Sequence, residues 1–355
     1  MNIIDYVDYF GDYSFKERPF NEVDNIIFSC LAYVDFNGIV PESRKILTIE
    51  EAYGIFKDTY KPRKKEMLAV KNANILFEKV SKSKRFKDIG LLNYKYVGDD
   101  ISQFSAITFM LDKKNYYVAF EGTDSLLSGW EEDCKMAYHF PVEAQVLAKN
   151  YLDKNFTMKK CNIIVGGHSK GGNLALVSSM YANYFVKKKI KSIYSNDGQG
   201  LRKAQIESKF YQKIESKYIH IIPNYSIVGL LLRHKDNYVV VKSSKKGFLA
   251  HDLLTWQVSY DHLEKDLLSR SSKVFDEGFT KWLDNYDDEK RKLFVTEVFK
   301  IMKENGIKDL MEIKLKKELI LNIIKQSKEI NPLVKEMTIE LFKVIGKTNF
   351  EYPLF

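Results

Sequence analysis

The chain of 355 residues has few cysteines and no long apolar segment. Its three cysteines are odd in number and show no C-x-x-C spacing, which argues against a disulfide framework or a zinc site. The first residues, MNIIDYVDYFGDY, carry acids where a secretory signal needs a basic segment. The longest uncharged runs, 171–186 and 218–232, are shorter than the roughly 18 apolar residues of a spanning helix. We therefore expect a soluble protein of the reducing cytoplasm, without metal or other cofactor.

Positive charge is unevenly distributed along the chain. The formal net charge is +9, and residues 59–95 hold eleven Lys and Arg against three Asp and Glu. A solvated helical face and loop would explain this stretch. Alternatively, it attracts anionic lipid or another acidic partner. No known nucleic-acid-binding motif accompanies it, so nucleic acid is not an expected partner.

The amino-terminal part of the chain has helical patterns. With 45% apolar and 29% charged residues, the composition is typical of a packed globular protein. Residues 20–36 predict a helix, and residues 48–57 predict a second, which begins at a capping box of Thr48 and Glu51. A lysine-rich helical stretch continues to about residue 87. We expect residues 1–100 to form a helical region packed on the core.

From residue 101 the pattern changes to alternating strands and helices. DKKN separates two β-rich runs, which predicts a hairpin. Strands that alternate with helices indicate a parallel sheet covered on both faces, so the fold class is α/β, with its core at 101–263. From 264 to 355 we expect a charged helical extension. The predicted strands are 104–111, 116–121, 162–167, 190–197, 218–224 and 237–244, and the predicted helices are 142–156, 172–188 and 201–214.

The pentapeptide GHSKG at 167–171 fits the pattern G-x-S-x-G. In a nucleophile elbow, the serine sits on a strained turn between a strand and a helix, and the flanking glycines allow close approach of the two elements. The amino terminus of the following helix favours negative charge that develops at the site. Ser169 is therefore a candidate nucleophile. The alternative is a tight structural turn that contains a serine.

An oxyanion hole needs two hydrogen-bond donors near such a serine. One is expected from the backbone N–H of Lys170, the residue after the nucleophile, and the other from the loop after an earlier strand. In YYVAFEGTD that loop begins at Gly122-Thr123, so Thr123 can offer its N–H and its hydroxyl; an ordinary strand-end turn is the alternative. His168 adjoins the serine, but neighbouring side chains at such a turn point apart. We therefore expect His168 to have a packing role.

These motifs together resemble the class 3 (fungal-type) lipases, whose pattern is FRGT/S, then W and D, then GHSLGG. Here the motifs read FEGTD, W, D and GGHSKGGNLA. The segments LAYVDF, SNDGQGL, PNYSIVGLLL and HDLLTWQV are similar to those of a bacterial branch of lipase-like α/β-hydrolases, and this looser resemblance covers nearly the whole chain. The resemblance implies an α/β-hydrolase fold with a mainly parallel sheet. It implies Ser169 as nucleophile, Thr123 and Lys170 as oxyanion hole, and residues 124–135 in the place of a lid that contains Trp130.

The chain departs from the lipase pattern at the catalytic acid. Glu121 replaces the Arg of FRGT/S, and Ser226 stands where the pattern has the acid. A serine cannot stabilise an imidazolium as a carboxylate does. Asp197 is the best substitute, because it ends a predicted strand after the nucleophile helix and carboxyl ends of strands form sites in such sheets. It could instead make an Asx turn or a helix cap, and Asp236 in RHKDN is a weaker rival.

The catalytic histidine should follow the acid in the chain. His220 lies inside a predicted strand, His234 in a charged loop and His262 at a polar helical start. His251 opens HDLLTWQ after the last predicted strand, where class 3 lipases also carry a histidine near an aromatic residue. His251 is therefore the candidate base, with a surface loop or helix cap as the alternative.

The constellation predicts acyl transfer through a covalent intermediate on Ser169. Carboxylic esters are expected as substrates from the resemblance alone, and the same groups could cleave a thioester or amide. The alternative is a catalytically weak hydrolase fold that serves as a binding or interaction protein. A third hypothesis is work at a membrane, with residues 59–95 and Trp130 on one face.

Overall fold

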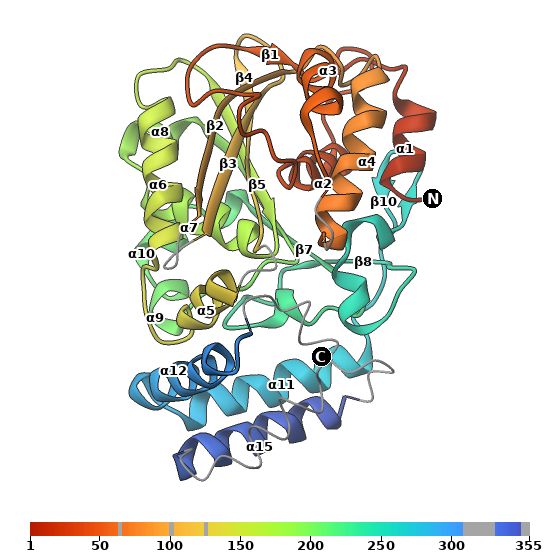
Figure 1. Cartoon of the computed structure of the whole chain (residues 1–355). Coiled ribbons are helices and arrows are strands. Elements are labelled where there is room, and N and C mark those ends of the chain that lie inside the picture. The colour runs from red at the N-terminus through yellow and green to blue at the C-terminus, as the bar shows by residue number, and fades with distance from the viewer. Residues whose placement is uncertain (63–65, 99–102, 124–126, 308–330, 349–355) are drawn as a thin grey trace.

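A central sheet of eight strands organises the molecule (Figure 1). The computed structural model describes residues 1–62, 66–98, 103–123, 127–307 and 331–348. The strands lie in chain order: the first four are antiparallel and the pairs from β4 to β8 are parallel. This confirms the predicted α/β-hydrolase fold. The strands are β1 (Leu47–Thr48), β2 (Gly90–Gly98), β3 (Gln103–Met110), β4 (Asn115–Phe120), β5 (Asn162–His168), β6 (Ile190–Asn196), β7 (Tyr218–Pro223) and β8 (Val239–Val241).

Helices cover both faces of this sheet, and a third group lies beyond the carboxyl ends of its parallel strands (Figure 1). One face carries α1 (Ile3–Phe10), α2 (Glu22–Leu31), α3 (Ile49–Thr59) and α4 (Leu68–Lys82). The other carries α6 (Glu143–Phe156), α7 (Lys170–Tyr181), α8 (Tyr184–Lys189) and α10 (Lys209–Gln212). The third group is α11 (Arg270–Asn285), α12 (Asp288–Glu304) and α15 (Pro332–Gly346), next to α5 (Leu127–Lys135) and α9 (Lys203–Ile206). No helix within the described ranges has the length and apolarity needed to cross a bilayer.

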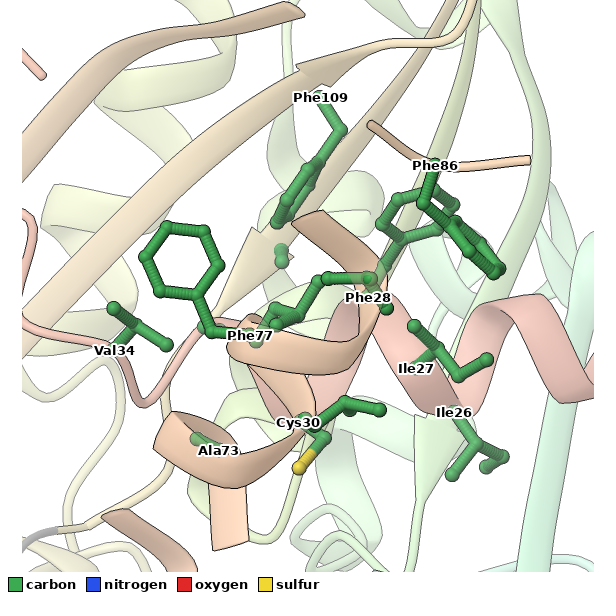
Figure 2. Packing of buried hydrophobic residues seen from close by; sticks show 14 of the residues in the cluster. Ile26, Ile27, Phe28, Cys30, Val34, Ala73, Phe77, Phe86 and Phe109 are labelled. Atoms are coloured by element: carbon green, nitrogen blue, oxygen red, sulfur yellow. The ribbon is translucent and has the colours of Figure 1, made fainter. Parts of the chain in front are cut away.

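Capping boxes and aromatic packing explain the amino-terminal helices. The predicted box at Thr48 and Glu51 is confirmed, since each side chain binds the other residue's backbone N–H. Helix α2 buries nine of its ten residues. Phe28 packs on Phe86 and Phe109, with ring centroids 5.8 and 4.7 Å apart (Figure 2). This cluster packs α2 against the sheet. As a result, the segment after α2 lies at the carboxyl ends of the parallel strands, where Tyr33 contacts His168.

Three predicted elements differ from the structure. Residues 1–100 are not wholly helical, because β1 and β2 extend the sheet. A bulge at Asn93, with φ +57°, interrupts the alternation of β2 and hides it from pattern analysis. The helix expected over 172–188 is divided, because the Asn183 side chain caps a new helix by accepting from Val186 N. The helix expected over 201–214 is two single turns, and the Ser208 hydroxyl caps the second.

The carboxy-terminal helices share apolar clusters with the core. In one cluster, Met136, Val142 and Leu232 of the core lie with Trp282 of α11 and Met337 of α15. The domain limits at residues 100 and 263 stay predictions. The extension is nonetheless in contact with the segment that follows β4 and with the loop that follows β7.

Candidate active site

The candidate nucleophile lies on a strained turn between β5 and α7. Ser169 has φ +57° and ψ −131°, a left-handed conformation that a residue with a Cβ adopts at a cost. The close approach requires glycine on both sides. A Cβ on Gly171 would lie 2.1 Å from the Phe120 carbonyl oxygen, and one on Gly167 would lie 2.4 Å from the Gly171 carbonyl. The GHSKG motif therefore forms the geometry of an elbow.

Asp197 and His251, 54 residues apart, meet at the carboxyl end of the sheet. Asp197 follows β6 in a left-handed conformation and is fully buried. His251 Nδ1 lies 2.6 Å from Asp197 Oδ2. Because an ionised carboxylate only accepts, Nδ1 carries the proton, and a neutral ring has its lone pair at Nε2. The backbone N–H of Ser169 donates to the carbonyl of Asn196, so the elbow adjoins the loop that holds this pair.

Ser226, at the position of the expected acid, lies beside the substitute. Its hydroxyl donates to Asp197 Oδ1 at 2.5 Å, and the Gly229 N–H donates to the same oxygen at 3.0 Å. Both oxygens of Asp197 are therefore hydrogen-bonded, which fixes the carboxylate towards His251. Because the two side chains touch, a carboxylate at position 226 would lie in nearly the same place as the one at position 197. From the sequence, Ser226 was recognised only as the position where the lipase acid is missing. Its role as a hydrogen-bond donor to Asp197 was not predicted.

Within the part of the chain that the structure describes, none of the other candidates for acid and base is hydrogen-bonded to this pair. Asp236 is exposed. His220 is buried in β7, where burial lowers its pKa from 6.5 to about 3. His234 faces Asp276 at 3.3 Å, and His262 is an exposed residue of a short hairpin.

His168 supports the candidate base instead of acting as one. Its Nε2 lies 2.8 Å from the carbonyl oxygen of His251, so Nε2 must carry the proton. Nδ1 then accepts from the Tyr33 hydroxyl at 2.8 Å. Burial, with a smaller effect of His251, lowers the pKa of His168 well below its usual value, so the ring is neutral. Tyr33, in the segment LAYVDF that follows α2, was not recognised from the sequence as part of the site.

One candidate oxyanion residue lies beside the elbow, and the other lies within it. Thr123 follows β4, and a Cβ on its neighbour Gly122 would lie 2.8 Å from the His168 carbonyl oxygen, so the two segments touch. The Thr123 hydroxyl donates to Asp133 Oδ2 at 2.5 Å. Lys170 begins α7 directly after the serine, and its side chain is buried. Asp133 was missed as a partner, although it is the aspartate that follows Trp130 in the motif.

The expected lid lies partly outside the described residues. Residues 124–126 are not described, and 127–135 form α5. Trp130 is half-buried and packs with a cluster that includes Val295 and Phe299 of α12. Trp130 thus contacts the carboxy-terminal extension.

Much of the positive charge in residues 59–95 is compensated. Arg85 is buried against Asp24 at 2.5 Å. Five lysines pair with carboxylates: Lys79 with Asp8, Lys82 with Glu78, Lys84 with Glu17, Lys87 with Glu50 and Lys95 with Glu42. Contact with anionic membranes stays a prediction.

One cavity, of about 390 Å³, lies at the boundary between the core and the extension. Its arginines are paired within the protein: Arg202 and Arg291 with Asp288, and Arg233 with Asp284. Ser169, Asp197 and His251 do not line it. Across the described ranges, no group of three or more His, Cys, Asp or Glu side chains is placed to hold a metal ion.

Comparison with known proteins places the chain in a family. A model of the Mbeg1-like family matches residues 80–300. The chain belongs to the Mbeg1-like family. This match spans more than half of the chain and includes the elbow, Asp197 and His251. The lipase-like resemblance that the motifs predict is confirmed. No protein of curated function matches this Mbeg1-like sequence.

Solved lipase structures are similar to this Mbeg1-like protein at low identity. The Rhizomucor miehei lipase in its propeptide complex is 12% identical, covers 69% of this chain and 80% of its own, and gives a TM-score of 0.38. A lipase from Rhizopus microsporus var. chinensis is 16% identical, with 70% and 80% covered and a TM-score of 0.37. Likenesses this distant assign no residue roles to the Mbeg1-like chain.

Proposed function

We propose that this Mbeg1-like protein is a serine hydrolase that cleaves carboxylic esters through an acyl-enzyme on Ser169. The observation that carries the proposal is the 2.6 Å contact between His251 Nδ1 and the buried Asp197, next to a G-x-S-x-G elbow. This contact sets the histidine tautomer that a general base needs. Lipase-like family membership supports the ester class.

The proposed reaction has two half-reactions. His251 Nε2 takes the proton of the Ser169 hydroxyl as its oxygen attacks the ester carbonyl carbon. The backbone N–H groups of Thr123 and Lys170 stabilise the oxyanion, and Asp197 stabilises the imidazolium. His251 then protonates the leaving alcohol. Water, deprotonated by His251, attacks the acyl-enzyme, which releases the acid and restores Ser169.

A fluorophosphonate probe and a p-nitrophenyl ester test this proposal on the full chain. We expect covalent labelling of the wild-type protein and none of Ser169→Ala. Turnover should fall on the order of 10⁶-fold in Ser169→Ala and about 10⁴-fold in Asp197→Asn. The exposed Asp236→Asn is the matched control and should retain wild-type turnover.

The test also separates the enzyme from the alternative, a catalytically weak interaction protein on the same fold. Absence of labelling in wild-type protein with a normal circular dichroism spectrum would overturn the hydrolase proposal. Equal labelling of the wild type and Ser169→Ala would show that another residue reacts, and would equally contradict it.

A further inference from the structure

The side chain that follows the nucleophile is buried and charged. The class 3 pattern GHSLGG has a leucine there, and this chain has Lys170. The Lys170 side chain is 1% exposed. Its ammonium donates to Glu132 Oε2 at 2.5 Å and to the Gln103 carbonyl at 3.1 Å. A buried ammonium is costly unless it is paired, so this arrangement needs a reason beyond packing.

Two adjacent carboxylates of α5 face this ammonium. Glu132 is paired with it directly, and Asp133 Oδ1 lies 3.7 Å from Lys170 Nζ. Both side chains are buried, at 2% and 8% exposure. Burial raises the pKa of Asp133 to about 6, and the Lys170 charge acts in the opposite direction. Without the ammonium, two buried like charges would be next to each other, and protonation would be favoured.

Asp133 is in turn hydrogen-bonded to Thr123, the candidate oxyanion residue. Its Oδ2 accepts the Thr123 hydroxyl at 2.5 Å. An ionised carboxylate can only accept, so the Thr123 hydroxyl proton points at Asp133 and the rotamer is fixed. A protonated Asp133 could donate instead, and the hydroxyl would be free to turn. The charge on Lys170 is thus connected to the position of Thr123 through one carboxylate.

We propose that the Lys170 side chain is a positioning residue for the oxyanion hole: its ammonium keeps Asp133 an acceptor, and Asp133 fixes Thr123. This inference rests on the proposed hydrolase function. The competing explanation is that Lys170 and Glu132 only clamp α5 to the core. In the positioning explanation, the contact of Lys170 that affects kcat is the one with Asp133. In the clamp explanation, it is the one with Glu132.

Kinetic variants distinguish the two explanations. We expect Lys170→Met to lower kcat about 10- to 100-fold, with KM changed less than about 3-fold. The upper value equals the smallest effect typical of losing one oxyanion donor, about 100-fold. In an Asp133→Asn background, Lys170→Met should cost kcat far less, because the uncharged amide oxygen accepts without a cation. The double variant Lys170→Met/Glu132→Gln should recover thermal stability but not kcat.

The control is a lysine away from the site whose ammonium also donates to backbone carbonyls. Lys217 donates to the carbonyls of Lys187 and Ile190, so Lys217→Met removes a half-buried lysine far from Thr123. It should leave kcat unchanged. If Glu132→Gln restores both stability and kcat to Lys170→Met, the clamp explanation holds and the positioning role is wrong.

A second readout needs no turnover. The ¹³C carboxyl shift of Asp133, followed against pH, should have its midpoint one unit or more higher in Lys170→Met than in the wild type. Among the described residues, the titratable groups that act on or feel the charge of Asp133 include, besides Lys170 and Glu132, Tyr33 and Cys134. Burial keeps Tyr33 and Cys134 neutral in this range by raising the pKa of each. An unshifted midpoint overturns the inference even if fluorophosphonate labels Ser169. A shifted midpoint in a protein that is not labelled overturns the hydrolase proposal, while the link from Lys170 to Asp133 stands.

Discussion

At the scale of single residues, the Ser226 hydroxyl donates a hydrogen bond to Asp197, the carboxylate that we propose as the acid. Ser226 and Gly229 both donate to Asp197 Oδ1, while His251 binds Oδ2. The charge on Asp197 is buried, and these three donors replace the water it loses. The lipase pattern places the acid at the loop after β7, and we propose that this protein has it at the loop after β6. Under this proposal, the contact between Ser226 and Asp197 allows the acid to change strands without a change in the site's shape.

Ser226→Ala should therefore weaken the fold more than turnover. Loss of a hydrogen bond to a buried charged group costs about 1.5–3 kcal/mol of unfolding free energy. The fall in kcat should be under about 10-fold, because the bond from His251 to Oδ2 remains. Urea unfolding and ester hydrolysis check the two values, with the exposed Ser244→Ala as control. A kcat loss as large as that of Asp197→Asn would mean that Ser226 itself carries the role of the acid.

At the scale of elements, the strand-turn-helix unit depends on contacts between backbones. Strand β4 lies beside β5, and the Phe120 carbonyl approaches Gly171 at the start of α7. Backbone cannot move aside as a flexible side chain can. Close packing of β4, β5 and α7 therefore requires glycine at these elbow positions, whether or not Ser169 is catalytic.

Two glycine substitutions test this difference. Gly171→Ala should cost about 3 kcal/mol or more, at the upper end of overpacking, since its Cβ would lie 2.1 Å from the Phe120 carbonyl oxygen. Gly54→Ala in α3 has no atom within 4 Å of the new Cβ and should stabilise by about 0.5–1 kcal/mol. Thermal unfolding measures both. Similar stability of the two variants would contradict the close packing at the elbow.

At the scale of the whole molecule, the helical extension and the hydrolase core share their apolar surfaces. Trp282 lies in one cluster with Met136 and Leu232, and its indole N–H donates to the Met337 carbonyl. Arg291 of α12 donates to the Ala137 carbonyl after α5. The extension thus contacts α5, the helix whose other side carries Glu132 and Asp133.

We expect one cooperative heat-unfolding transition for the core and the extension. Trp282→Ala should lower the unfolding free energy by about 3–5 kcal/mol and shift the whole transition. Differential scanning calorimetry measures both. Two separate transitions in the wild-type protein, with only one moved by the substitution, would contradict this coupling.

Local signals in the sequence were sufficient for many of the elements and for the turn that holds Ser169. The capping box at Thr48, the hairpin across DKKN and the GHSKG turn each depend on residues a few positions apart, so pattern reasoning found them. The bulge in β2 and the cap at Asn183 were missed, because each breaks a period that the pattern analysis assumed.

The chain by itself determined the fold class, the elbow and a short set of candidate acids and histidines. Only the tertiary structure decided which of them meet: His251 Nδ1 lies 2.6 Å from Asp197 Oδ2, and within the described residues neither Asp236 nor another of these histidines is hydrogen-bonded to Asp197. The same holds for the donor role of Ser226 and the contact of Lys170 with Glu132 and Asp133. These contacts join loops at the ends of different strands. Their pairing depends on strand order and burial, which no spacing along the sequence encodes.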